Sequence, residues 1–113
     1  ELAVTKLDVL SGLKEIPVCI GYGYEYNDCN GKAKYTTLLT FRHPSILKDC
    51  RPLYINLPGW DKDISNSKKY EELPANARNY LQYISNETNL PITLISVGPE
   101  RNQTIECDIQ PED

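Results

Sequence analysis

Two short stretches of this sequence place polar side chains directly after apolar runs, where they could bind a small molecule. The first is Lys6-Leu7-Asp8, which follows Leu2-Ala3-Val4, and the second is Ser96-Val97-Gly98, which ends an apolar run that starts at Pro91. In open α/β sheets, ligands bind beyond the carboxyl ends of the strands. Because both stretches lie at such ends, we expect them to contribute to one binding site.

The chemistry of these residues fits a guanine base. Guanine carries two donors on one edge, N1–H and the 2-amino group, and the single carboxylate of Asp8 can accept both. Adenine presents a lone pair at N1, so the same carboxylate would disfavour it. The apolar stem of Lys6 can lie along a purine plane while its ammonium stays in water. The guanine O6 needs a donor, which a main-chain N–H of the turn at Ser96-Val97-Gly98 can supply.

Both stretches also have a simpler interpretation. A Lys-x-Asp sequence is a common polar end to a buried strand, and Ser-x-Gly-Pro is a common turn. The residue types and their spacing leave the binding site and the purely structural interpretation open.

The apolar patterns predict a mixed α and β fold. Pro74 is placed to start a helix near residues 74–89, with one apolar stripe at a 3.6-residue period and Asn89 as its C-terminal cap. Asn30-Gly31 predicts a hairpin turn with positive φ angles. The residues from Trp60 to Glu72 are polar and predict a surface excursion. Strands are expected over residues 2–7, 16–26, 34–41, 53–57, 91–98 and 103–109.

Length and composition exclude several classes of protein. A chain of 113 residues has room for one domain, and 40% apolar with 25% charged residues is ordinary for a globular protein. The net charge of -4 argues against binding to a nucleic-acid duplex. No apolar run approaches the ~20 residues of a membrane helix, and there is no signal peptide. We expect neither nucleic acid nor membrane as a partner.

The cysteines at positions 19, 29, 50 and 107 form no C-x-x-C pair, and His43 is the only histidine. This spacing predicts no metal site and no catalytic role for His43. Free thiols in a reducing compartment predict a cytoplasmic protein. The alternative is two disulfides in a secreted, β-rich binding module. A titration of thiols under denaturing conditions separates the two interpretations.

Four stretches, in order, closely resemble the C-terminal part of adenylosuccinate synthetase: TKLDVLSGLKEIPVCIGY, LPGW, YEELPANARNYLQYI and LPITLISVGPERNQTI. The resemblance covers nearly the whole chain and is weakest over residues 25–51. It implies that residues 1–113 are the C-terminal, guanine-binding portion of a P-loop-NTPase-like nucleotide-binding enzyme. Six positions match the two guanine loops of the family: Lys6, Leu7, Asp8, Ser96, Val97 and Gly98.

The resemblance also implies an activity for the whole enzyme. The family is a ligase of purine nucleotide biosynthesis that joins IMP and L-aspartate on the way to AMP, with GTP as co-substrate and Mg²⁺. GTP phosphorylates the inosine 6-oxygen, and the aspartate amine then displaces phosphate, which is a far better leaving group than the original oxygen. A cytoplasmic homodimer is implied for the intact enzyme.

The parts of the family that hold phosphate, Mg²⁺, IMP and aspartate have no counterpart in this sequence. Gly21-Tyr22-Gly23 is too sparse in glycine to form the phosphate loop, and no catalytic residue is assigned in this stretch. Because the chain starts with Glu1 and enters a strand at once, we expect a fragment that cannot catalyse alone. The segments around Cys29 and Cys50 have no assigned role. Trp60 is expected to pack on the sheet, and Arg101 either supports the second loop or points into water.

Overall fold

The computed structural model describes residues 1–38 and 48–112. The chain divides into two compact units. The first consists of Glu1–Ile16 and Leu57–Asp113, and the second consists of Pro17–Asn56. Both loops with predicted binding residues belong to the first unit.

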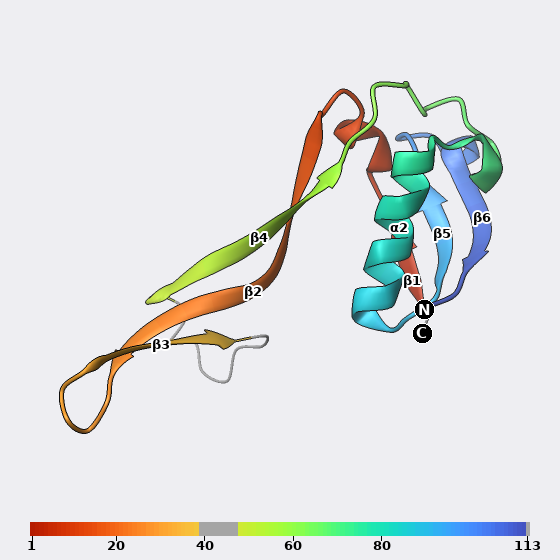
Figure 1. The fold of residues 1–113 in the computed structure, drawn as a ribbon. Helices are drawn as coiled ribbons and strands as arrows, with labels where there is room; N and C mark the ends of the chain where they lie inside the picture. The colour runs from red at the N-terminus through yellow and green to blue at the C-terminus, as the bar shows by residue number, and fades with distance from the viewer. Residues whose placement is uncertain (39–47, 113) are drawn as a thin grey trace. The chain divides into compact units, whose positions relative to one another are not determined.

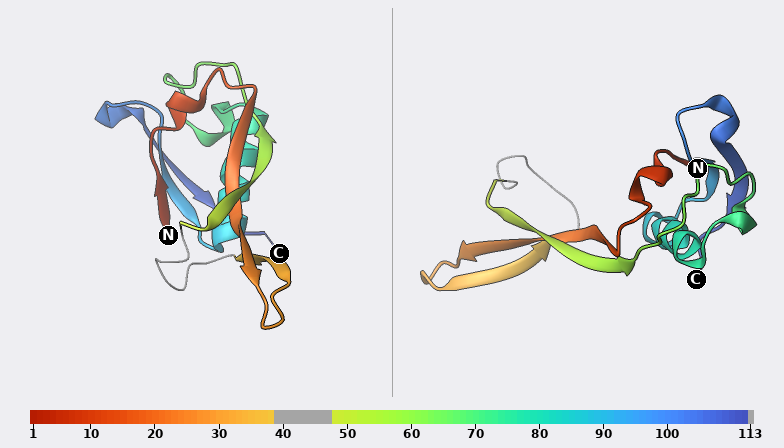
Figure 2. Two further views of the ribbon diagram at one scale, coloured as in Figure 1. Left: turned by 90° about the vertical axis from the view of Figure 1, so that its left-hand side faces the viewer. Right: turned by 90° about the horizontal axis from the view of Figure 1, so that it is seen from above.

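The first unit contains a three-stranded sheet in the order β1-β5-β6. Strands β1 (Leu2–Val4) and β5 (Ile92–Ser96) run parallel, whereas β6 (Thr104–Ile109) is antiparallel to β5. The helix α2 (Ala75–Thr88) covers one face of this sheet (Figure 1, Figure 2). The predicted mixed α and β fold class is confirmed.

The apolar periodicity of α2 explains how the helix packs. Ala77, Leu81 and Ser85 are one turn apart on the same side, and all three are 0% exposed. Burial of a leucine of this kind stabilises the fold by about 2 kcal/mol. The helix ends at Asn89, which adopts the left-handed conformation (φ 56°) predicted for a C-terminal cap. Pro74 precedes the first helical residue instead of occupying it.

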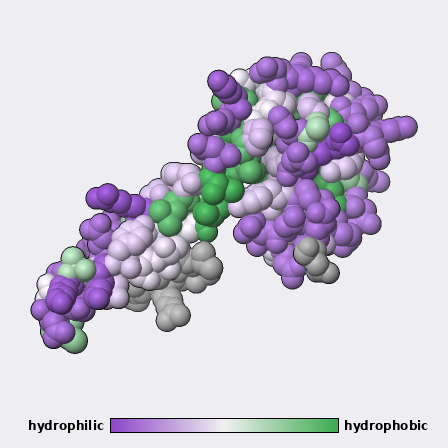
Figure 3. All heavy atoms as spheres, in the orientation of Figure 1, coloured by the Kyte–Doolittle hydropathy of each residue, from purple (hydrophilic) through white to green (hydrophobic). Residues whose placement is uncertain are grey.

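A single core forms between the sheet and α2. The surface of the first unit that faces the viewer in Figure 3 is predominantly hydrophilic, so the apolar side chains gather inside. Within residues 1–38 and 48–112, the buried apolar residues all belong to the first unit: Leu7, Ile16, Trp60, Ile64, Leu73, Ala77, Leu81, Ile92, Ile95, Val97, Ile105 and Ile109.

The segment between β4 (Cys50–Pro58) and α2 differs from the prediction. Its polar composition predicts a surface excursion over residues 60–72, but Trp60, Ile64 and Ser67 are buried. Only the intervening residues and the short 3-10 helix η2 (Tyr70–Glu72) lie at the surface. A few widely spaced apolar or small residues are therefore enough to anchor this segment on the core. Trp60 is buried as expected, and its ring lies 6.1 Å from that of Tyr80 on α2.

The second unit contains the sheet β3-β2-β4. Its strands are β2 (Glu15–Asn27), β3 (Ala33–Leu38) and β4 (Cys50–Pro58). The predicted strands at 16–26 and 53–57 are confirmed with longer bounds. The predicted strand at 34–41 is confirmed up to Leu38, and its remainder lies outside the described residues, as does His43.

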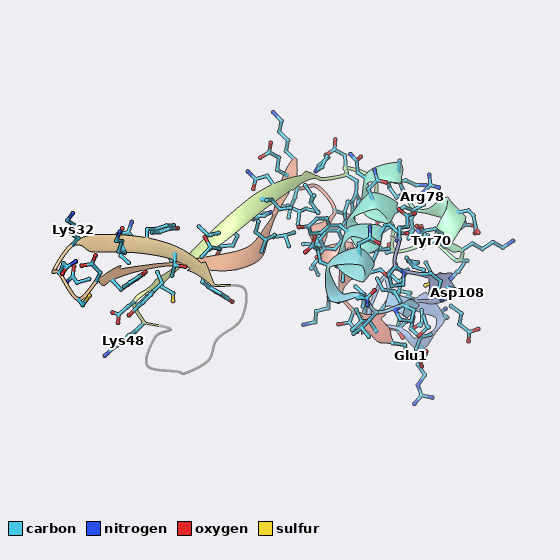
Figure 4. The ribbon with its side chains drawn as sticks, turned by 60° about the horizontal axis from the view of Figure 1, so that its bottom comes forward. Glu1, Lys32, Lys48, Tyr70, Arg78 and Asp108 are labelled. Atoms are coloured by element: carbon cyan, nitrogen blue, oxygen red, sulfur yellow. The ribbon has the colours of Figure 1, made fainter. Side chains whose placement is uncertain are left out.

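The hairpin predicted at Asn30-Gly31 is present between β2 and β3, but only one of the two residues has the expected positive φ angle. Only Gly31 has a positive φ (79°), and Asn30 does not. The Asp28 N–H donates to the Lys32 carbonyl at 2.9 Å, while the Asp28 side chain accepts the N–H groups of Asn30 and Lys32, both at 2.9 Å. Asp28 thus closes a longer turn, whose position Lys32 marks in Figure 4.

Candidate functional site

The two predicted loops lie at the same edge of the first unit's sheet. In the parallel pairing of β1 with β5, Val4 is the partner of Ile95. Lys6 follows the end of β1 by two residues, and Ser96 is the last residue of β5. The short 3-10 helix η1 (Leu7–Leu10) contacts β5. The two loops therefore lie at the same edge of the sheet, as expected for loops that follow two parallel strands.

The first loop begins earlier than predicted. The expected strand over residues 2–7 is wrong after Val4, because Lys6 adopts the left-handed conformation (φ 58°, ψ 32°) and η1 begins at Leu7. This conformation is uncommon for a residue with a Cβ and is found at ligand-binding loops. It turns the Leu7 side chain into the core, where it is 0% exposed. Leu7 is thus part of the core and does not lie on the exposed surface of the loop.

Asp8 presents its carboxylate at the surface of this loop. It lies in the first turn of η1 and is partly exposed. Across residues 1–38 and 48–112, neither the Asp8 carboxylate nor the Lys6 ammonium forms a hydrogen bond or an ion pair. No side chain caps η1 either. The simpler interpretation, in which Asp8 caps the strand end, has no support from these contacts.

The turn after η1 is fixed by Trp60. The Trp60 indole N–H donates to Ser11 Oγ at 2.9 Å, and the Gly12 N–H donates to the Trp60 carbonyl at 2.8 Å. Gly59 leaves room for this approach, because a Cβ there would lie 1.8 Å from the Leu13 carbonyl oxygen. The LPGW stretch therefore holds the turn that follows the first loop. The sequence alone does not predict this role.

The second loop is organised by its own hydrogen bonds. Ser96 Oγ donates to the Gly98 carbonyl at 3.0 Å, so this hydroxyl stabilises the turn. The Val97 N–H donates to the Gln103 carbonyl at 2.8 Å, and the Glu100 N–H donates to Gln103 Oε1 at 3.0 Å. Pro99 has no N–H. Val97 is fully buried, so its side chain belongs to the core.

These bonds leave one donor in the second loop. Gly98 is buried, and its N–H has no acceptor among the residues that the structure describes. A buried N–H without a partner is rare in folded proteins, because its desolvation is costly. The Gly98 N–H is therefore the group with which this turn can bind an acceptor such as a purine oxygen. The site thus combines a carboxylate acceptor on one loop with a backbone donor on the other.

The structure does not connect the other polar candidate positions with the two loops. Arg101 is exposed in the short 3-10 helix η3 (Arg101–Gln103). Tyr70 and Arg78, which Figure 4 labels, line a hollow of about 360 Å³ that is lined by none of the predicted site residues. Burial at this position raises the pKa of Tyr70. Among the described residues, no group of three His, Cys, Asp or Glu side chains could hold a metal ion.

A parallel strand pair separated in sequence by a helix, with polar loops beyond both strand ends, is typical of nucleotide-binding α/β enzymes. The family model described as adenylosuccinate synthetase matches residues 1–105. The chain belongs to this family.

Curated relatives and a solved structure agree with this assignment. The adenylosuccinate synthetase of Pelotomaculum thermopropionicum is 48% identical over 104 residues, which is 92% of this chain and 22% of that protein. That of Carboxydothermus hydrogenoformans is 47% identical over 110 residues, covering 95% of this chain and 23% of that protein. A fully ligated adenylosuccinate synthetase from Plasmodium falciparum superposes with a TM-score of 0.76 at 35% identity, over 93% of this chain and 24% of its own. The chain thus spans less than a quarter of these relatives.

The state of the cysteines bears on the alternative interpretation, a secreted module with two disulfides. All four cysteines lie in the described part of the chain, and none forms a disulfide. A secreted module stapled by two disulfides is therefore not favoured. No helix in residues 1–38 or 48–112 is long and apolar enough to cross a membrane.

Proposed function

We propose that residues 1–113 are the C-terminal, guanine-recognising portion of a GTP-dependent adenylosuccinate synthetase. The observation that carries this proposal is that the Asp8 carboxylate and the Gly98 N–H belong to loops at the same sheet edge and have no partner among the described residues. The family membership and the spacing of the two loops support it.

Each group has a distinct role in this proposal. The Asp8 carboxylate accepts the N1–H and 2-amino hydrogens of guanine, and the Gly98 N–H donates to O6. The apolar stem of Lys6 covers the purine plane, and its left-handed backbone directs the chain into η1. Leu7 and Val97 anchor the two loops in the core, and Ser96 fixes the turn through the Gly98 carbonyl.

The rest of the reaction belongs to other parts of the proposed enzyme. There, GTP transfers its γ-phosphoryl group to the 6-oxygen of IMP, and the amine of L-aspartate then displaces phosphate to form adenylosuccinate. Phosphate groups and Mg²⁺ need cationic and carboxylate ligands of their own, and the described residues contain no candidate metal cluster. We place the intact enzyme in the cytoplasm, as a homodimer that serves AMP synthesis.

The second unit fits a segment that packs on another part of the intact enzyme. Among its described residues, no apolar side chain is buried, whereas Ile20, Tyr26, Tyr35 and Tyr54 are each at least 42% exposed. A sheet without a core of its own is only marginally stable in water. These exposed apolar and aromatic side chains support an intact enzyme in which further protein surface covers the second unit.

The full-length protein that contains this chain tests the proposal. Adenylosuccinate formation from IMP and L-aspartate should depend on GTP and Mg²⁺, and ATP at the same concentration should support only a small fraction of the rate. Equal rates with ATP and GTP would contradict guanine recognition. The absence of any product in a folded full-length protein would contradict the proposed activity itself.

A further inference from the structure

Gln103 lies outside the predicted turn but forms hydrogen bonds with three backbone groups, two of them in or next to the second loop. Its Oε1 accepts the Glu100 N–H at 3.0 Å, and its backbone carbonyl accepts the Val97 N–H at 2.8 Å. Its Nε2 donates to the carbonyl of Ser65 at 3.1 Å, which ties the loop to the segment before η2. Gln103 therefore accepts hydrogen bonds from two backbone N–H groups near Gly98, but it accepts none from the Gly98 N–H itself.

The side chain of Gln103 also sets the position of the Gly98 backbone. A Cβ built on Gly98 would lie 2.2 Å from Cδ and Oε1 of Gln103 and 2.4 Å from its Nε2. The amide group is thus packed directly against the Gly98 Cα, in the space that any other residue would fill. Glycine is required at position 98 for close approach, and Gln103 is the group that approaches it.

The acceptor of the Gln103 amide is itself fixed. The Ser65 N–H donates to Asp63 Oδ1 at 2.9 Å, and this bond lowers the pKa of the Asp63 carboxyl group. The Asp63 carboxylate thus holds the Ser65 backbone through this hydrogen bond. Ile64, between the two, is fully buried. The amide of Gln103 is consequently attached to the core, not to a mobile surface chain.

We infer that Gln103 is a positioning residue for guanine recognition: it directs the Gly98 N–H toward the purine O6 by occupying the neighbouring donors and packing against Gly98. This inference rests on the proposed function and adds a residue that does not itself contact the base. It predicts that removal of the amide weakens the binding of every purine nucleotide that has an oxygen at position 6. Recognition of the 2-amino group by Asp8 should be unaffected.

Steady-state kinetics of the full-length protein test this inference. Gln103→Leu keeps the size of the side chain but removes both amide hydrogen bonds, and we expect the KM for GTP to rise about tenfold. The KM values for IMP and aspartate should stay close to those of wild type, and the KM for ITP should rise by the same factor as that for GTP. ITP is informative because it keeps O6 and lacks the 2-amino group.

Gln82→Leu is the matched control. Gln82 also donates from Nε2 to a distant carbonyl, that of Gln110 at 2.8 Å, but it lies on α2 away from both loops. It should lower the melting temperature about as much as Gln103→Leu and leave all KM values unchanged. If the two variants behave alike in KM, Gln103 has only a structural role and the inference is overturned.

A second pair of variants remains decisive if Gln103→Leu does not fold. Gly98→Ala should raise the KM for GTP because its Cβ displaces the Gln103 amide, and Gln103→Ala should raise it as well. The KM for GTP of the double variant should not exceed that of Gly98→Ala alone, because loss of the Gln103 amide leaves room for the new Cβ at position 98. Additive losses would overturn the inference. If the wild-type protein shows no preference for GTP over ATP, the proposed function is contradicted. If that preference is present but the Gln103 variants have an unchanged KM for GTP, only the positioning role of Gln103 is contradicted.

Discussion

Val4 and Ile95 are partners in a parallel strand pair, although they lie near opposite ends of the sequence. Their pairing brings the residues just beyond each strand to one edge of the sheet. The carboxylate of Asp8 and the N–H of Gly98 are polar groups of these two loops with no partner among the described residues. Strand register thus explains why two short stretches, each ordinary when taken separately, can form one site.

The 113-residue chain by itself should form no adenylosuccinate from IMP, L-aspartate and GTP. It offers no group of candidate metal ligands among its described residues, and phosphoryl transfer depends on positioning and charge stabilisation by such groups. Product formation is measured by chromatography, with circular dichroism to verify that the chain is folded and full-length protein as a positive control. Turnover above that of a sample without protein would contradict this expectation.

The isolated chain should also bind GTP weakly. In the proposed site, the contacts to the base include hydrogen bonds to a charged carboxylate, each worth about 1.5–3 kcal/mol net. Set against the cost of association, this leaves a dissociation constant of roughly 1 mM or weaker. Isothermal calorimetry with GTP gives the value, and guanosine should bind about as well as GTP because we expect other parts of the intact enzyme to bind the phosphates. Micromolar affinity would indicate a phosphate site in this chain.

Local patterns predict those parts of the fold in which one interaction dominates. The stripe of α2 and the cap at Asn89 follow from helical periodicity and from the tolerance of asparagine for positive φ. The pair Asn30-Gly31 predicts the hairpin but not the conformation of both turn residues, because the Asp28 side chain binds two backbone N–H groups and stabilises a longer loop. Such competition between a side chain and the turn residues is not visible in a dipeptide pattern.

The candidate site is likewise predictable only where residue type alone identifies a polar group. Lys6, Asp8 and Ser96 stand out by residue type, but their neighbours Leu7 and Val97 serve the core. The supporting contacts escape sequence reasoning because Trp60 and Gln103 connect the loops to distant segments. A glycine next to a proline gives no sign that a glutamine amide lies against it.

The thiols should differ in reactivity, and the difference should depend on pH. Burial raises the pKa of the Cys107 thiol above the ordinary value of 9.0, so at any pH near 8 its thiolate fraction is smaller than that of an ordinary thiol. Cys29 is exposed. Iodoacetamide at mildly alkaline pH should therefore modify Cys29 first and Cys107 last, and the rate at Cys107 should still be rising where that of an ordinary thiol levels off.

Peptide mass spectrometry assigns the modified cysteines. In denaturant without reductant, all four should react, because none is in a disulfide. Two disulfides would leave no reactive thiol and would restore the secreted-module interpretation. Equal rates at Cys29 and Cys107 in the folded chain would contradict the burial of Cys107.

Asp8→Asn in the full-length protein tests which group recognises the base. The substitution preserves size and shape but replaces one carboxylate oxygen with an amide donor, which then faces the 2-amino group of guanine. A buried donor without a partner should weaken GTP binding by about 2–4 kcal/mol. Xanthine carries an oxygen at that position and N1–H beside it, so the amide can pair with both. XTP should therefore partly restore the activity of the variant, with the KM values for IMP and aspartate little changed.

The ratio of kcat/KM for GTP to that for XTP, measured in wild type and variant, decides the role of Asp8. Asp61→Asn is a suitable control, because Asp61 is an exposed carboxylate of the same unit outside both loops. It should leave the ratio unchanged. If Asp8 only stabilised the end of β1, Asp8→Asn would lower the melting temperature and reduce activity with both nucleotides equally. An unchanged ratio would therefore show that Asp8 does not contact the base, and that Lys6-Leu7-Asp8 is only the polar end of a strand.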